Sequence, residues 1–84
     1  MKKFKSEIKI TLREGILDVQ GKTVENALHS MGIPEIAHVR IGRFVTTEIA
    51  AETQEQAFEI IDKACKQLIA NPIIEDYFIE LKEI

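Results

Sequence analysis

Residues 15–23, GILDVQGKT, are the part of the sequence that comes nearest to a known chemical motif. They place a glycine, a spacer and then Gly-Lys-Thr between an alternating segment and an apolar-periodic one, as in a phosphate-binding loop. That loop needs glycines five positions apart so that its amide hydrogens converge, whereas Gly15 and Gly21 are six apart. Asp18 in the spacer would repel an anion, and no later apolar strand ends in an aspartate that could hold magnesium. The loop therefore does not predict nucleotide hydrolysis.

The other side chains with chemical potential do not form a recognisable site. His29, His38 and Cys65 come from three different predicted elements, and no two of them have the spacing of metal ligands. Cys65 falls in an apolar stripe, where a thiol behaves as a small hydrophobic group. Glu75 and Asp76 are adjacent, so on a strand they would face opposite ways and could not act as a carboxylate pair. These residues predict no catalytic, cofactor-binding or metal site.

Length, composition and charge bound the class of protein. The chain has 84 residues, enough for one domain over residues 1–84 but not for an additional nucleotide-binding fold. Charged residues make up 30% and hydrophobic residues 45%, intermixed throughout, which argues against disorder and against a membrane span. The net charge of -3 and the scattered basic residues argue against a nucleic-acid partner. With a single cysteine and no signal-peptide pattern, we expect a cytoplasmic protein.

Hydrophobic periodicity predicts the first strand and the first helix. From residue 4 to residue 12 the even positions are mainly apolar and the odd ones polar, which is typical of a strand with one buried face. Apolar residues then recur at helical spacing up to Gly32, and Asp18 is placed to cap the start of this helix. We therefore expect a strand over 4–12 and a helix over about 18–31.

The middle segment, residues 36–50, predicts either one long strand or a hairpin. Its sequence, IAHVRIGRFVTTEIA, is rich in β-branched side chains. Its odd apolar positions, from Val39 to Ile49, keep one register across Gly42, which favours a single strand that is bulged at the glycine. A two-residue turn at Gly42 and Arg43 would instead fold the segment back on itself.

A second helix and a last strand complete the predicted elements. Thr53 and Gln56 have the spacing of a capping box, and Asn71 with Pro72 ends the helix. Residues 77–84 alternate again and predict a strand. The predicted fold class is α+β, a small antiparallel sheet with two helices on one face in the order β-α-β-α-β, related to the ferredoxin-like plan. The apolar stripe of the second helix consists of Ala57, Ile60, Ile61, Ala64, Cys65, Leu68 and Ile69.

The length of the middle segment predicts an oligomer. A strand over 36–50 would span roughly 45 Å at about 3.3 Å per residue, whereas a globule of this size is about 30 Å across. The overhanging part would expose backbone groups and the side chains of Phe44, Val45 and Ile49, which is tolerable when another chain covers them. We therefore expect a homodimer or homotetramer with strand pairing or exchange; a hairpin would remove this expectation.

Three strings of residues resemble a known family. They are GILDVQG at 15–21, AHVRIGR at 37–43 and LIANPIIEDYFIEL at 68–81. In this order, and nearly end to end, they are similar to PurS, a subunit of formylglycinamide ribonucleotide amidotransferase (phosphoribosylformylglycinamidine synthase). Val19 stands where many members have proline, and Arg43 stands where lysine is usual. Neither departure removes a needed property, because proline helps a first helical turn without being required and arginine keeps the charge.

The resemblance implies a noncatalytic accessory subunit in de novo purine biosynthesis. A PurS subunit bridges a PurL-type synthetase to a PurQ-type glutaminase, so that ammonia from glutamine converts formylglycinamide ribonucleotide (FGAR) to its amidine (FGAM). ATP and magnesium are then expected on the synthetase, with no cofactor on this chain. The family motifs map onto residues 15–21 and 39–43, and we expect Asp18, Gln20, Arg40 and Arg43 to contact partner proteins.

Two other functions remain open. A free-standing ferredoxin-like dimer could act as a small-molecule sensor, with its ligand bound between subunits; ligand-induced thermal stabilisation would reveal it. A single-strand nucleic-acid binder is disfavoured by the net charge and by the lack of a visible pair of stacking aromatics in the predicted sheet.

Overall fold

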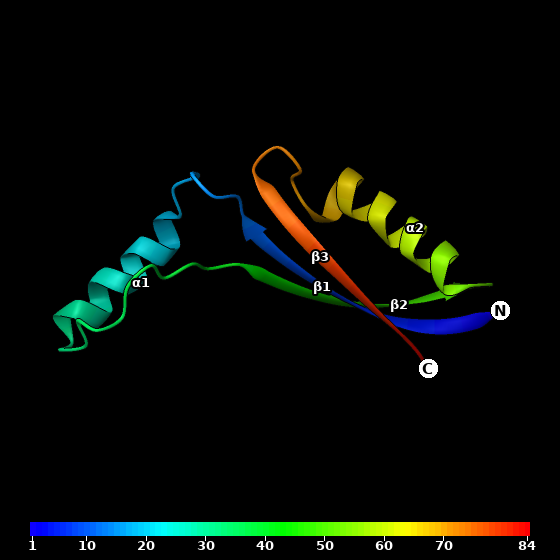
Figure 1. Ribbon diagram of the computed structural model, residues 1–84, viewed down its shortest axis with the longest axis horizontal. Coiled ribbons are helices and arrows are strands. Elements are labelled where there is room, and N and C mark those ends of the chain that lie inside the picture. Colours follow the sequence, from blue (N-terminus) through cyan, green and yellow to red (C-terminus); the bar gives the residue numbers. More distant parts are fainter.

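The alternating N-terminal segment forms the central strand of a three-stranded antiparallel sheet (Figure 1). The computed structural model describes residues 1–84. The strand order is β2-β1-β3, so the middle and last strands both pair with the first. These findings confirm the predicted α+β class and the element order. The elements are β1 (Lys2–Leu12), α1 (Val19–Ser30), β2 (Arg43–Ala51), α2 (Gln54–Ala64), the π-helical turn η1 (Cys65–Ile69) and β3 (Glu75–Glu83).

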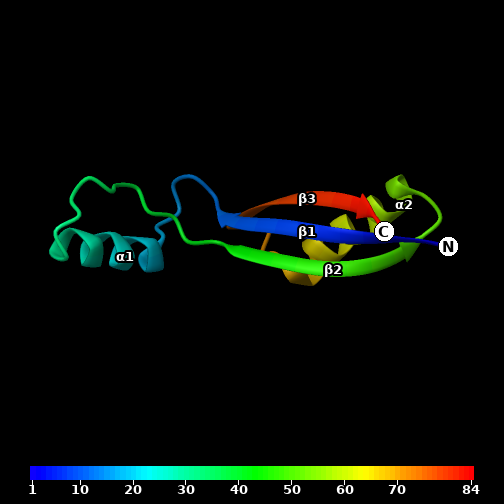
Figure 2. The ribbon, with the colours of Figure 1, turned by 90° about the horizontal axis from the view of Figure 1, so that it is seen from below.

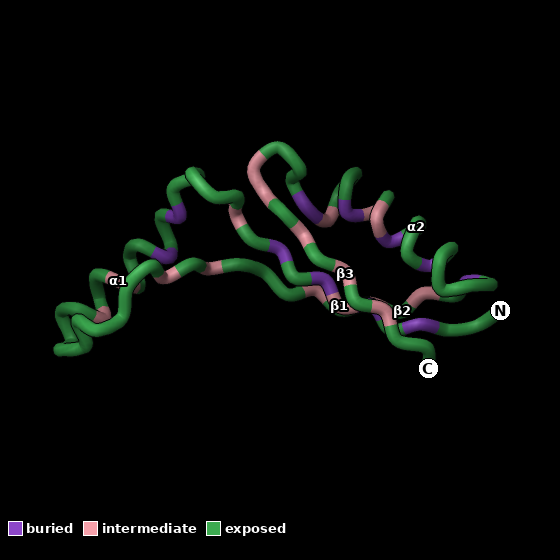
Figure 3. The backbone as a smooth tube through the Cα atoms, viewed as in Figure 1, coloured by how far each residue is buried: buried purple, intermediate pink, exposed green.

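The hydrophobic core lies between α2 and one face of the sheet (Figure 3). Its residues on β1 are the even positions that the sequence assigned to the buried face, and on α2 and η1 they recur at helical spacing. Burial of these side chains is the main force that holds the helix on the sheet. The fully or nearly buried apolar residues are Phe4, Ile8, Ile10, Ala51, Ala57, Ile61, Cys65 and Ala70.

The start of α2 is capped as the sequence predicts. Thr53 Oγ1 accepts a hydrogen bond from the Gln56 amide at 3.1 Å. The Gln56 side chain in turn accepts from the amide of Glu52 at 2.7 Å, one residue before the cap. Two amide groups that lack a partner inside the helix are therefore satisfied by side chains.

Two members of the predicted apolar stripe, Ile60 and Leu68, do not join the core. Ile60 is 46% exposed and Leu68 is 87% exposed, whereas Ile69 packs against the core. A π-helical turn contains one more residue than an α-helical turn, so η1 shifts the register after Cys65. The shift rotates Leu68 outward and brings Ile69 onto the sheet.

The middle segment is neither one long strand nor a hairpin. β2 begins only at Arg43, which pairs with Ile10 near the end of β1. Residues 36–42 have no neighbouring strand to pair with, and they run extended beside α1 (Figure 2). The predicted alternation holds only within β2, where Val45 and Ile49 are partly buried; Val39 and Ile41 are partly buried too, but they lie outside the strand. Val45 and Ile49 pack against the core and do not overhang the sheet, unlike the prediction.

Only α2 covers the sheet; α1 projects beyond the end of it (Figures 1 and 2). We call α1 together with residues 31–42 the arm. The molecule measures 53 × 26 × 14 Å, and its radius of gyration is 16.5 Å. A compact domain of this length has a radius of gyration of about 12 Å. The arm overhangs the sheet, but it consists of a helix and an unpaired segment and is not the long strand that the sequence predicted. No helix combines the length and the apolarity needed to cross a membrane.

Candidate partner-binding site

The four residues expected to contact partners lie at the junction between the sheet and the arm. Asp18, Gln20 and Arg43 line a hollow of about 340 Å³ there, together with residues from the end of β1. Asp18 and Arg40 line a neighbouring hollow of about 300 Å³ beside the extended part of the arm. The structure thus brings the two family motifs to one place, although 17 residues separate the end of the first at Gly21 from the start of the second at Val39.

Asp18 stabilises the junction from inside through two hydrogen bonds to the backbone. Its Oδ1 accepts a hydrogen bond from the Gly21 amide at 2.8 Å, which caps α1 as predicted. Its Oδ2 accepts from the Ile41 amide at 2.6 Å, which the sequence did not predict. The two backbone hydrogen bonds, first from Gly21 and then from Ile41, lower the pKa of the carboxyl group. Because the residue is 7% exposed, its carboxylate has little surface to offer a partner.

Two glycines allow the backbone segments at the junction to approach closely. A Cβ atom on Gly21 would overlap the carbonyl oxygen of Val39, and one on Gly42 would overlap the carbonyl oxygen of Ile10. Gly21 therefore lets α1 approach the extended segment, and Gly42 lets the chain pass close to the backbone of β1 just before β2 begins. These contacts give a structural reason for two of the three glycines in the motif strings, Gly21 and Gly42.

Further contacts along α1 hold the extended segment in place. The Val39 amide donates to Glu25 Oε1 at 3.2 Å, and His29 Nε2 lies 2.7 Å from the carbonyl oxygen of Ile36. The hydrogen bond from Val39 lowers the pKa of Glu25. His38 adopts a positive φ of 58°, an uncommon conformation for a residue other than glycine. His29 thus contacts the backbone of the arm, and His38 takes up a left-handed backbone position within it.

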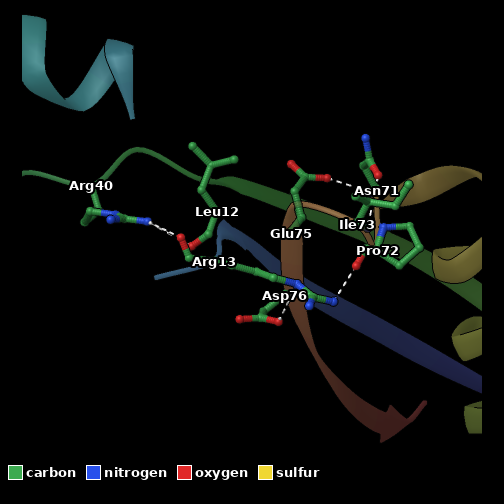
Figure 4. Close-up of polar contacts among 8 residues, drawn as sticks. All are labelled: Leu12, Arg13, Arg40, Asn71, Pro72, Ile73, Glu75 and Asp76. Atoms are coloured by element: carbon green, nitrogen blue, oxygen red, sulfur yellow. Dashed lines mark hydrogen bonds and ion pairs between the residues drawn. The ribbon is translucent and has the colours of Figure 1, made fainter. Parts of the chain in front are cut away.

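Arg40 connects the arm to the end of β1, and Arg13 connects that end of β1 to the loop before β3 and to the start of β3 (Figure 4). Arg40 Nη2 donates to the carbonyl oxygens of Leu12 and Arg13 at 2.9 and 3.2 Å. Arg13 donates to the carbonyl oxygen of Pro72, and its Nε lies 3.5 Å from Asp76 Oδ1. The loop before β3 is therefore fastened to the end of β1.

Arg43 stabilises the junction further through an ion pair with Glu75. Its Nη2 lies 2.8 Å from Glu75 Oε1, which also accepts from the amide of Asn71 at 2.7 Å. Glu75 is thus part of an ion pair, and Asp76 points to the other side of β3 as predicted, toward Arg13. The side chain of Arg43 remains 53% exposed, and Gln20 is exposed at the rim of the larger hollow.

The arrangement is suited to holding a rigid surface toward another protein. Exposed polar groups of Gln20 and Arg43 line the larger hollow, where half of the lining residues are hydrophobic, and Arg40 lines the neighbouring one. The carboxylate of Asp18 is engaged in hydrogen bonds between them. No group of three or more histidine, cysteine, aspartate or glutamate side chains is arranged to hold a metal ion. Cys65 is buried in the core as predicted, and burial raises the pKa of its thiol.

Sequence reasoning missed Glu25, Arg13 and Glu75 as parts of the junction. Glu25 carries no local signal, because its partner is an amide 14 positions away. Arg13 and Glu75 stood at predicted element boundaries, where a charged side chain normally indicates only contact with water. Their partners become visible once the register of β1 and β3 is known.

Known proteins resemble this chain along nearly all of its length. The family model "PurS: Phosphoribosylformylglycinamidine (FGAM) synthase" matches residues 5–83. The PurS subunit of phosphoribosylformylglycinamidine synthase from Bacillus subtilis is 38% identical over 82 residues, which cover 96% of this chain and 95% of that protein. The PurS subunit from Thermotoga maritima is 37% identical over 96% of each chain.

Solved structures agree in fold. The Methanocaldococcus jannaschii PurS structure has a TM-score of 0.86 and 32% identity, covering 96% of this chain and 98% of that one. A chain in the structure of PurLQS from Thermotoga maritima has a TM-score of 0.86 and 34% identity, covering all of both chains. The resemblance inferred from the three motif strings is thereby confirmed. The chain belongs to the PurS family, whose members are subunits of phosphoribosylformylglycinamidine synthase in purine biosynthesis.

Proposed function

We propose that this chain bridges a PurL-type synthetase and a PurQ-type glutaminase, so that ammonia released from glutamine is used to convert FGAR to FGAM. The observation that carries the proposal is the match over the whole chain to a subunit in the PurLQS structure from Thermotoga maritima. The chain contributes no catalytic residue in this proposal, and ATP and magnesium bind to the synthetase. Its role is to hold the two larger subunits together in the cytoplasm.

The shape of the molecule supports a bridging role. It is 53 Å long, and the junction fixes the arm to the sheet through side chains of both motifs. An elongated body with a rigid junction can touch two proteins at once without losing much conformational freedom on binding. The exposed Gln20, Arg40 and Arg43 are available to such contacts, and Asp18 acts by positioning the arm.

We further propose that the chain acts as a homodimer or a homotetramer. Its accessible surface is 6136 Å², whereas a compact monomer of 9.6 kDa exposes about 5,100 Å². The excess of about 1,000 Å² is close to what one partner loses in a standard interface. The outer edges of β2 and β3 are open, and α1 exposes apolar side chains that no other element of the chain covers.

Reconstitution with purified partners tests the bridging role. A mixture of the synthetase and the glutaminase without this chain should use free ammonia, because ATP and FGAR bind to the synthetase in this proposal. Formation of FGAM from glutamine should be weak in that mixture. Adding the chain should restore the glutamine-dependent rate in a saturable way, at a fixed ratio to the other subunits, with no turnover from the chain alone.

Saturation separates assembly from a contaminating catalyst. If the glutamine-dependent rate is the same with and without the chain, the bridging role is wrong. A screen of small molecules by thermal stabilisation would then test the sensor hypothesis.

A further inference from the structure

The face of the sheet opposite α2 carries a row of three side chains that the sequence did not reveal as a group. Phe44 on β2 and Phe78 on β3 lie directly opposite Lys9 on β1. Residues that face each other in this way point to the same side of the sheet. Phe44 is 58% exposed and Phe78 is 64% exposed, although both are large apolar groups in regular strands. Two strand spacings, about 10 Å, separate the backbones of the two phenylalanines, with Lys9 on the strand between them.

No other part of the chain covers this row. α2 packs on the opposite face, and the arm extends past the end of the strands (Figure 2). The neighbouring rows on the same face are charged: Glu7 and Glu80 stand side by side, followed by Lys5, Lys82 and Glu48. On this surface two apolar side chains flank a cation, and an acidic row lies next to them. The surface is therefore organised into apolar and charged rows and is not uniformly polar.

We propose that this outer face, centred on Phe44, Lys9 and Phe78, docks one of the larger subunits of the synthase; this rests on the bridging function proposed above. The partner surface offers an acidic group to Lys9, an apolar contact on each side of it, and a basic group opposite Glu7 and Glu80. Aromatic side chains at the centre of such a patch, ringed by polar groups, supply most of the binding energy of many protein interfaces.

The charges disfavour a second copy of this chain as the occupant. A symmetric pair centred on the phenylalanines would set Lys9 against the Lys9 of its partner, and facing like charges oppose association. A two-fold axis placed between the row of Glu7 and Glu80 and the row of Lys5 and Lys82 would bring opposite charges together. Both phenylalanines would then lie away from the centre of the interface. The acidic groups Glu7, Glu48 and Glu80 on the same face also disfavour a nucleic-acid backbone.

The double variant Phe44→Thr/Phe78→Thr tests the proposal in the reconstituted complex. Threonine keeps strand propensity, and both side chains are exposed, so the fold should be retained, as checked by circular dichroism. The concentration of this chain that restores half of the glutamine-dependent rate should rise by at least about tenfold. Lys9→Glu should act in the same direction. The matched controls are Lys63→Glu on α2 and Leu68→Gln on η1, both at exposed positions. They should leave the concentration needed for half of the glutamine-dependent rate unchanged.

The outcomes separate the alternatives. Full rescue by the double variant at the wild-type concentration overturns the proposal while leaving the bridging function intact. A smaller homo-oligomer in the double variant with normal rescue would assign the face to a second copy. Binding of labelled oligouridine that the double variant loses would assign it to nucleic acid. If the wild-type chain itself gives no rescue, the bridging function is wrong. The docking proposal is then tested by the affinity of the wild type and of the double variant for each immobilised subunit: weaker binding by the variant supports it, and equal binding overturns it.

Discussion

The carboxylate of Asp18 and the amide of Ile41 are joined by a hydrogen bond of 2.6 Å. One aspartate thereby starts α1 and fixes the extended segment that returns beside it 23 residues later. A helix cap ordinarily acts on its own helix alone. Here the same side chain sets the direction of the arm relative to the sheet.

Replacing Asp18 with asparagine separates its two roles. An asparagine oxygen can still cap α1 at Gly21, but its amide group would face the Ile41 amide, donor against donor. We expect the midpoint of thermal unfolding to fall by roughly 4–8 °C, the shift that loss of one well-formed interaction causes in a domain of this size. Asn26→Asp, a change of the same size on an exposed part of α1, should leave the midpoint nearly unchanged.

The contribution of Asp18 should depend on pH in one direction. Its pKa is lowered from 3.8 by folding, so the ionised group stabilises the fold at pH values above that number. The stabilisation is lost as the pH falls through the lowered pKa. The difference in midpoint between wild type and Asp18→Asn should be constant near neutral pH and shrink in acid. A difference that grows below pH 4 would contradict the assignment.

Gly21→Ala should destabilise the protein, although alanine is the better helix former. The added methyl group would meet the carbonyl oxygen of Val39, so α1 and the extended segment would have to separate. We expect a loss of about 2 kcal/mol in the free energy of unfolding measured in urea, in the range of overpacking in a tight site. The neighbouring Lys22→Ala, which removes an exposed side chain 3.7 Å from Glu25, should change little.

Local patterns were enough to predict the elements, and the positions that depend on distant partners were not. The alternation of apolar and polar residues predicted β1 and its buried face, and the capping residues Asp18 and Thr53 predicted the starts of α1 and α2. The beginning of β2 depends on where β1 ends, because a strand needs a partner, and no property of residues 36–42 reveals that. The row of Phe44 and Phe78 likewise required the register of three strands.

Ser6→Ala should stabilise the protein. Ser6 lies in the centre of the buried face of β1, fully inaccessible, and its hydroxyl group has no hydrogen-bond partner. Alanine would remove this cost, and we expect about 1 kcal/mol of additional stability. The urea midpoint should rise with an unchanged slope. Thr46→Ala on the exposed face should not raise it, which separates this effect from a general preference for alanine.

Tyr77 should ionise only in strong alkali. Its Oη donates to Asp62 Oδ1 at 2.6 Å, and this hydrogen bond is the first cause that raises the pKa of Tyr77 to about 12. Since Tyr77 is the only tyrosine and there is no tryptophan, ultraviolet absorbance of tyrosinate reports on this residue alone. The raised pKa stabilises the fold below about pH 10, and that contribution is lost as the pH rises through 12. Asp62→Asn should bring the midpoint of the titration down toward 10, while a wild-type midpoint near 10 in the folded protein would exclude the interaction.

The isolated chain should sediment as a dimer or a tetramer of its 9.6 kDa subunit at micromolar concentration. The physical reason is the uncovered arm: Val24 on α1 is 37% exposed, and Met31, the C-cap residue of this helix, is 73% exposed. An isolated helix of 12 residues is marginal in water, so α1 needs a surface to pack on. Val24→Asp/Met31→Asp should lower the sedimenting mass, because burying two charges in an interface is costly. Asn26→Asp places a charge on the same helix away from Val24 and Met31 and should leave the mass unchanged. A folded wild-type monomer with full helix content would show that the arm is stable alone, and the excess surface would then have to be covered by the larger subunits.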